Sequence, residues 1–206
     1  VEVDLVCLPD GAQRFVVAAG KHQQRNAGFD GGVRAMSTRP LIWLSPATSE
    51  GELPRIAGAS SLAVDLEAAS YYRYKEKVCL LQFSLSDRDY LFDPLEHELP
   101  SELFAALSGE GPPLLLMHGA DFDVRLFKSD FGLPLGPLFD TQIAARFLGK
   151  SKTGLAALLE GELEISIDKK EQRSDWSQRP LSEQQLEYAQ RDTRHLHDLV
   201  AALRAQ

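Results

Sequence analysis

The stretch that most constrains this chain is Ser61-Leu-Ala-Val-Asp-Leu-Glu67, where a short apolar run ends in two carboxylates one residue apart. Side chains on a β-strand alternate between its two faces, so Asp65 and Glu67 point the same way if this run is a strand. Two adjacent carboxylates repel each other, and a divalent cation such as magnesium removes that cost because it prefers oxygen ligands. The alternative is a solvated strand end, since short motifs have many chance matches.

Length and charge narrow the class of protein. A chain of 206 residues suggests one domain, and its net charge of −8 argues against a protein that coats nucleic acid by neutralising many phosphates. An enzyme that holds a few nucleotides stays compatible with this charge, because metal ions can supply positive charge locally. No apolar run approaches the roughly 20 residues of a membrane span, so no membrane association is expected. Two cysteines form no disulfide framework, which favours a cytoplasmic location.

The chain divides into an irregular start and a regular remainder. Residues 1–41 are expected to be an extension, in which two apolar runs flank the turn Pro9-Asp10-Gly11 as a β-hairpin and a Gly-rich loop follows. In residues 42–206, strands are expected at 62–67, 77–85, 90–93, 114–117 and 138–139. Helices are expected at 49–56, 99–107, 121–130, 140–148, 153–159 and 182–204, with Asp140, Thr153 and Ser182 as N-caps. This order predicts an α/β fold in which helices cover both faces of a mixed sheet.

Two further acidic signals follow the first. His118-Gly-Ala-Asp-Phe-Asp123 comes directly after the apolar strand at 114–117, and strand ends are where sites assemble in α/β sheets. Asp123 is the better candidate, because Asp121 is well placed to be a helix N-cap instead. Tyr188 and Asp192 are four residues apart in the last helix, so phenol and carboxylate share one helix face.

Four stretches together resemble the ribonuclease D family of 3′→5′ exonucleases, of the DEDDy type. They are residues 62–84 with Asp-x-Glu, 117–132 with HGADFD, 139–149 with FDTQIAARFLG, and 170–196 with the Arg-Ser-Asp-Trp run and YAQRD. The Asp-x-Glu alone is weak evidence. All four stretches in this order, at matching spacings, are highly specific.

The resemblance implies a ribonuclease H-like fold with a mixed five-stranded sheet. It places Asp65, Glu67, Asp123 and Asp192 on the family's four metal-binding carboxylates and Tyr188 on its characteristic tyrosine. It implies a metal-dependent 3′→5′ exoribonuclease that uses two divalent cations, Mg²⁺ or Mn²⁺, to release 5′-mononucleotides. Its partner would be a single-stranded 3′ end, with RNA favoured over DNA, and no obligate protein partner is evident.

The sequence indicates residues that contact substrate less clearly than it indicates the metal-binding carboxylates. Phe122 is a candidate for stacking a terminal base, and Lys170 and Arg173 are candidates for phosphate contacts. His118 is a further candidate, although a local hydrogen bond at the strand end explains it equally well. Two alternatives remain open: the same chemistry on single-stranded DNA, which lacks the 2′-hydroxyl, and a non-catalytic nucleic-acid-binding module that kept the fold.

Overall fold

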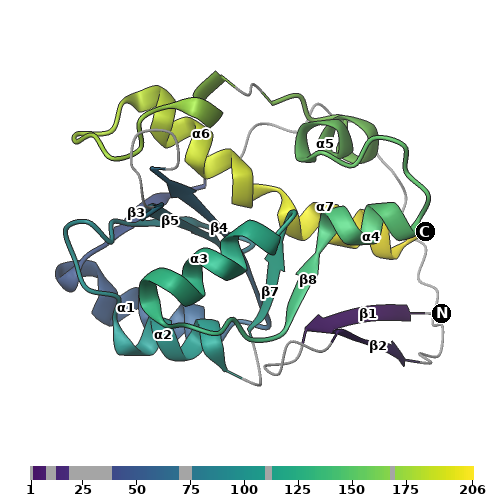
Figure 1. Cartoon of the computed structure of the whole chain (residues 1–206), viewed down its shortest axis with the longest axis horizontal. Helices are drawn as coiled ribbons and strands as arrows, with labels where there is room; N and C mark the ends of the chain where they lie inside the picture. Colours follow the sequence, from purple (N-terminus) through teal and green to yellow (C-terminus); the bar gives the residue numbers. More distant parts are fainter. Residues whose placement is uncertain (1, 8–12, 19–38, 70–75, 110–112, 168–169) are drawn as a thin grey trace.

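A mixed six-stranded sheet forms the centre of the molecule (Figure 1). The computed structural model of the chain describes residues 2–7, 13–18, 39–69, 76–109, 113–167 and 170–206. The strands of this sheet are β3 (Leu41–Leu44), β4 (Ser61–Ala68), β5 (Val78–Ser84), β6 (Asp89–Phe92), β7 (Leu114–Met117) and β8 (Leu138–Asp140), in the spatial order β3-β6-β5-β4-β7-β8. β4, β5 and β6 form an antiparallel meander, β7 runs parallel to β4, and β8 runs parallel to β7.

The expected α/β class is confirmed, but the sheet has six strands rather than five. β3 is the additional strand, and it pairs in parallel with β6 at the edge of the sheet. Its four residues carry no alternation that distinguishes a strand from any short apolar run. Strand preference depends on the neighbours that a segment meets, so only the pairing with β6 defines this strand.

Helices cover both faces of the sheet, as expected (Figure 1). One face packs against α1 (Pro46–Ala57), α2 (Ser101–Ser108) and α3 (Asp121–Phe131). The other carries α4 (Thr141–Phe147), α5 (Leu155–Leu163), α6 (Glu183–Arg194) and α7 (Leu196–Arg204), and a short 3₁₀ helix, η1 (Lys170–Arg173), precedes α6. β5 is buried along its whole length, because it lies inside the sheet with helices on both sides.

The first residues form the expected hairpin. β1 (Glu2–Cys7) pairs antiparallel with β2 (Gln13–Ala18) as a separate two-stranded sheet. The expected Gly-rich loop at 20–38 lies outside the described residues. The division of the chain near residue 41 stays a prediction.

Two of the expected helix caps are confirmed. The Asp140 side chain accepts hydrogen bonds from the backbone N–H groups of Gln142 and Ile143 at the start of α4. Ser182 and Gln185 form a capping box at the start of α6. Thr153 is not a cap, because Gly154 occupies the N-cap position of α5 without a side-chain hydrogen bond.

The single long helix expected at 182–204 is wrong, since the chain bends at His195 between α6 and α7. The Arg39 guanidinium donates to the backbone carbonyl of Arg194 at this bend, over 2.7 Å. The apolar face of α7 then packs on Ala63 and Leu116, whereas α6 packs on Leu80 and Leu91. The bend lets two consecutive helices bury their apolar faces on different parts of one sheet.

Candidate active site

Four carboxylates from three elements meet near the end of the inner strand β4. Asp65 and Glu67 lie on β4, Asp123 is the third residue of α3, and Asp192 lies on α6. β4 and β7 are parallel neighbours, so the end of β4 lies beside the segment that leads from β7 into α3. All four carboxylates and Tyr188 line one hollow of about 840 Å³. The structure therefore brings together the five residues that the sequence singled out.

Burial first, and neighbouring charges second, disfavour the ionised form of the carboxylates in this hollow. Burial raises the pKa of Asp65 to about 7. Burial, and then the charges of Asp65 and Asp140, raise the pKa of Asp123 to about 9. Burial and the neighbouring carboxylates also hold the pKa values of Glu67 and Asp192 well above their ordinary values. Asp65 and Glu67 keep part of their surface open to the hollow, but the surrounding protein removes most of their water. Without cations, the protonated form of these carboxyl groups is therefore favoured in the hollow, and a bound cation would favour the ionised form.

The donor atoms fit divalent cations such as magnesium, which bind carboxylate oxygens and offset repulsion between them. Within the described residues, no three His, Cys, Asp or Glu side chains already stand in an arrangement that would hold one ion. The four carboxylates instead line the hollow around a shared space.

Gln82 is a buried polar residue of the site that the sequence analysis missed. It lies on β5 directly opposite Asp65 on β4, and it is fully buried. Directly opposed residues of an antiparallel pair face the same side of the sheet. Its amide makes no hydrogen bond of normal geometry, yet it lies close enough to Glu67 to lower the pKa of that carboxyl group. The signal that could have revealed it is the strand register, which places a polar residue beside an acidic one.

Tyr188 faces the same hollow and contacts Asp192 through its hydroxyl group. Burial, followed by the charges of Asp192, Glu67 and Asp65, raises the pKa of the phenol above its ordinary value. The ring packs against Trp176, with the ring centroids 6.0 Å apart and the planes tilted by 44°. Tyr188 therefore stays protonated near neutral pH in this form and acts as a hydrogen-bond donor.

Asp140 has a second role beyond the expected cap. Its carboxylate also accepts hydrogen bonds from the backbone N–H groups of Gly119 at 3.0 Å and Ala120 at 2.8 Å, in the turn that leads into α3. One buried carboxylate thus joins the start of α3 to the start of α4. Because Asp123 lies in the first turn of α3, this junction positions it relative to β4.

The other candidates divide into those at the hollow and those elsewhere. His118, Phe122 and Arg173 line the hollow. The Nδ1 atom of His118 also lies 2.9 Å from the Thr141 hydroxyl oxygen, so the expected local hydrogen bond is present. The side chain of Lys170 lies outside what the structure describes.

Asp121 is exposed and pairs with Arg125 over 2.9 Å, away from the hollow. The N-cap position of α3 belongs to Ala120, so the expected cap at Asp121 is wrong. The choice between the two neighbouring acids is nevertheless clear, because only Asp123 faces the other carboxylates.

Comparison with known proteins shows the family to which this chain belongs. A family described as 3′-5′ exonucleases matches residues 47–206, which is most of the chain. The chain belongs to the ribonuclease D-like, DEDDy-type 3′-5′ exonuclease family. The exosome complex exonuclease RRP6 of Saccharomyces cerevisiae is 35% identical over 79% of this chain and 22% of its own length. The chain thus spans about a fifth of that relative's length.

Two solved structures have a similar fold. Escherichia coli RNase D, an exoribonuclease involved in structured RNA processing, superimposes with a TM-score of 0.73 and 30% identity, over 82% of this chain and 44% of that one. Brucella melitensis NrnC with bound Mg²⁺ superimposes with a TM-score of 0.66 and 25% identity, over 80% and 78% of the two chains. The expected family and fold class are confirmed, and a divalent metal ion is the family's cofactor.

Proposed function

We propose that this chain is a metal-dependent 3′→5′ exoribonuclease that releases 5′-mononucleotides from single-stranded RNA ends. The observation that carries the proposal is the convergence of Asp65, Glu67, Asp123, Asp192 and Tyr188 on one hollow. Four mutually repelling carboxylates destabilise a fold unless cations complete the site. Their arrangement therefore favours a catalytic role over a fold kept for binding alone.

The four carboxylates would hold two divalent cations, Mg²⁺ or Mn²⁺. When bound, such a pair activates a water molecule for attack on a phosphodiester and stabilises the leaving 3′-oxygen. Tyr188 would hydrogen-bond the attacking water and orient it, because its phenol stays protonated and lies beside Asp192. Trp176 restricts the ring of Tyr188 and so keeps this donor in place.

The walls of the hollow suit the end of a nucleic-acid strand. Phe122 and His118 belong to the lining, and Leu155 and Ile167 contribute apolar surface to it. Apolar and aromatic walls favour a base by stacking and burial. Arg173 is the cation of the described lining and is exposed, so we propose that it contacts a substrate phosphate. Lys170, which precedes it in η1, is proposed for the same role.

RNA is favoured over DNA because the relatives point to RNA. E. coli RNase D is described as an exoribonuclease, and yeast RRP6 as an exonuclease of the exosome complex. Among the described residues, no helix combines the length and the apolar composition that a membrane span requires. A cytoplasmic location and activity without an obligate protein partner stay predictions.

The test uses RNA labelled at its 5′ end, incubated with Mg²⁺ or Mn²⁺ and separated on a sequencing gel. The wild-type protein should shorten the RNA from its 3′ end, and a chelator should stop the reaction. Asp123→Asn should abolish the ladder. Asp121→Asn is the matched control, because it makes the same change two residues away at an exposed carboxylate.

Three results would contradict the proposal in different ways. RNA that keeps its length with both metals would exclude exoribonuclease activity. Digestion of a matched DNA strand alone would replace RNA with single-stranded DNA as the substrate. Binding of RNA without cleavage, unchanged in Asp123→Asn, would indicate a non-catalytic module.

A further inference from the structure

Helix α6 carries two residues of the proposed site, so its attachment to the sheet decides where those residues lie. It packs over β4, β5 and β6, and part of its contact with the sheet is polar. The buried polar residues there include Ser84 on β5, Asp89 on β6 and Thr193 on α6. Buried polar groups are costly unless they are hydrogen-bonded, so their partners show what the contact accomplishes.

Asp89 is the centre of this polar contact and is only 1% exposed. Its carboxylate accepts hydrogen bonds from the side chains of Gln190 at 3.0 Å, Arg194 Nε at 2.8 Å and Ser84 Oγ at 2.7 Å. Arg194 Nη2 lies 2.7 Å from the same carboxylate oxygen that its Nε contacts. The Ser84 hydroxyl also lies 2.7 Å from that of Thr193. Three residues around Asp192 are therefore tied to one carboxylate on β6.

A second carboxylate follows the other end of β6. Asp93 is 4% exposed and forms an ion pair with Arg179, in the segment before α6. The Arg179 guanidinium also donates to the backbone carbonyls of Cys79 at 2.7 Å and Trp176 at 2.8 Å. Trp176 in turn packs against the ring of Tyr188. The segment that approaches α6 is thus tied to the sheet through a second arginine.

We propose that Asp89 and Asp93, at the two ends of β6, are positioning residues that set the place of α6 along the sheet. Through Arg194 and Gln190, Asp89 places the turn that carries Asp192. Through Arg179, Asp93 places Trp176 and the ring of Tyr188. This inference rests on the proposed function, because it assigns a purpose to the position of those two site residues.

The geometry gives a reason why such a device is needed. Asp65 and Glu67 share one strand, so the strand itself sets their separation. Asp192 arrives on a separate helix, so its distance from them depends on how α6 is held on the sheet. Directional hydrogen bonds resist sliding of a helix, whereas apolar contacts are non-directional. Catalytic groups must be held within fractions of an ångström, which makes the directional attachment useful.

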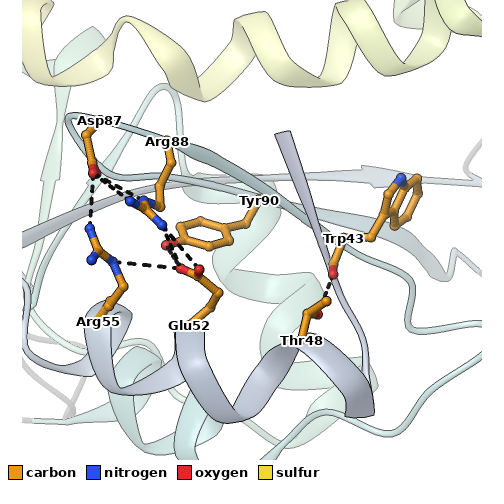
Figure 2. A network of polar contacts seen from close by, with 7 residues as sticks. All are labelled: Trp43, Thr48, Glu52, Arg55, Asp87, Arg88 and Tyr90. Carbon is orange, nitrogen blue, oxygen red and sulfur yellow. Dashed lines mark hydrogen bonds and ion pairs between the residues drawn. The ribbon is translucent and has the colours of Figure 1, made fainter. Parts of the chain in front are cut away.

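The opposite face of the hairpin formed by β5 and β6 provides a matched control (Figure 2). Residues alternate along β6, and Tyr90 faces α1 where Asp89 faces α6. The Tyr90 hydroxyl donates to Glu52 on α1 over 2.7 Å, and Arg88 Nη1 lies 3.2 Å from the same carboxylate. Figure 2 shows this network between α1 and the β5–β6 hairpin. Glu52 thus joins a helix to the same hairpin through an arginine, but on the face away from the hollow.

The experiment compares Asp89→Asn with Glu52→Gln in three measurements. Calorimetric titration with Mn²⁺ should show about tenfold weaker binding for Asp89→Asn, as is typical when partners that orient metal ligands are changed. Glu52→Gln should stay within about twofold of wild type in the same titration. On RNA, Asp89→Asn should lower kcat more than it changes KM, because it misplaces Asp192 rather than the substrate walls.

Hydrogen exchange on the metal-free protein gives a readout that needs no activity. Amides of α6 should exchange faster in Asp89→Asn, whereas Glu52→Gln should affect α1 instead. Arg194→Lys keeps a charge partner for Asp89 and should recover part of the Mn²⁺ affinity that Arg194→Met loses. These arginine variants also serve if Asp89→Asn does not fold.

Two results would overturn the inference. The first is a folded Asp89→Asn protein with wild-type Mn²⁺ affinity and unchanged exchange in α6. The second is an equal loss of Mn²⁺ affinity in Glu52→Gln, which would mean that general destabilisation is the cause. If the wild-type protein itself neither binds Mn²⁺ nor cleaves RNA, the proposed function fails, and exchange in α6 still decides whether Asp89 holds the helix.

Discussion

Replacing Asp123 by Asn should stabilise the metal-free protein while it destroys the metal response. Asp123 is 8% exposed, and burial with neighbouring charges raises its pKa to about 9. At pH 7 the folded chain must protonate this acid, whose ordinary pKa is 3.8. That requires about 4 kcal/mol, at 1.36 kcal/mol for each of roughly three pH units. A neutral amide of the same shape avoids this cost.

The full amount is an upper bound, because the four carboxylates share the repulsion and can spread apart. We therefore expect Asp123→Asn to raise the free energy of unfolding in chelator by about 1–3 kcal/mol. For a chain of this length, that corresponds to a rise of about 3–10 °C in Tm. If Asp123 were instead part of a satisfied buried hydrogen-bond network, Asp123→Asn would lower the free energy of unfolding by about 1–3 kcal/mol.

The assay is thermal unfolding at pH 7 in chelator and with Mn²⁺ at about 100 times its Kd. Wild-type protein should gain about 2.7 kcal/mol from the metal by mass action, and Asp123→Asn should gain little. Asp121→Asn should match wild type in both conditions, because that carboxylate is exposed and outside the hollow. A lower Tm for Asp123→Asn in chelator would refute the view that the carboxylates repel one another there.

Three further predictions follow from the same geometry. In chelator, the free energy of unfolding should fall as pH rises from about 4 to 8. The pKa of Asp65 is raised to about 7 and that of Asp123 to about 9, so the folded state binds more protons than the unfolded state over this range. Denaturant titrations across this range would show the fall, and a free energy of unfolding that rises instead would contradict it. Asp140→Ala should cost about 2–4 kcal/mol in urea unfolding, because four backbone N–H groups lose their acceptor; a loss below about 0.5 kcal/mol would mean that water replaces the carboxylate. Tyr188→Phe should lower single-turnover cleavage about 10²-fold while Mn²⁺ affinity changes less than threefold, because the phenol orients water rather than binding metal; equal losses in both would make Tyr188 a part of the metal site.

The site residues could be predicted from sequence because each lies in a short local pattern. Asp65 and Glu67 alternate on one strand, and Tyr188 and Asp192 are one helical turn apart. Asp123 follows a strand that is buried and fully apolar. Period and position along an element decide which way such side chains point, and both can be counted in the sequence.

The residues that hold the site together lie beyond such local patterns. Gln82 is paired with Asp65 only through the register of β4 and β5, and Asp89 meets Arg194 from 105 positions away. In sequence, Asp89 is the last residue of the turn Ser86-Asp-Arg-Asp89, where a solvated charge is the ordinary expectation. The covering helix α6 removes it from water and supplies Gln190 and Arg194 as partners.

The sequence alone determined which side chains could form the site and on which element each one lies, because strand and helix periods are local properties of the backbone. The tertiary structure decided the sixth strand, the bend at His195 and the buried ion pairs that hold α6. Those features depend on contacts between segments far apart in the chain. Their free energy exists only once the sheet has assembled, so no local pattern in the sequence records it.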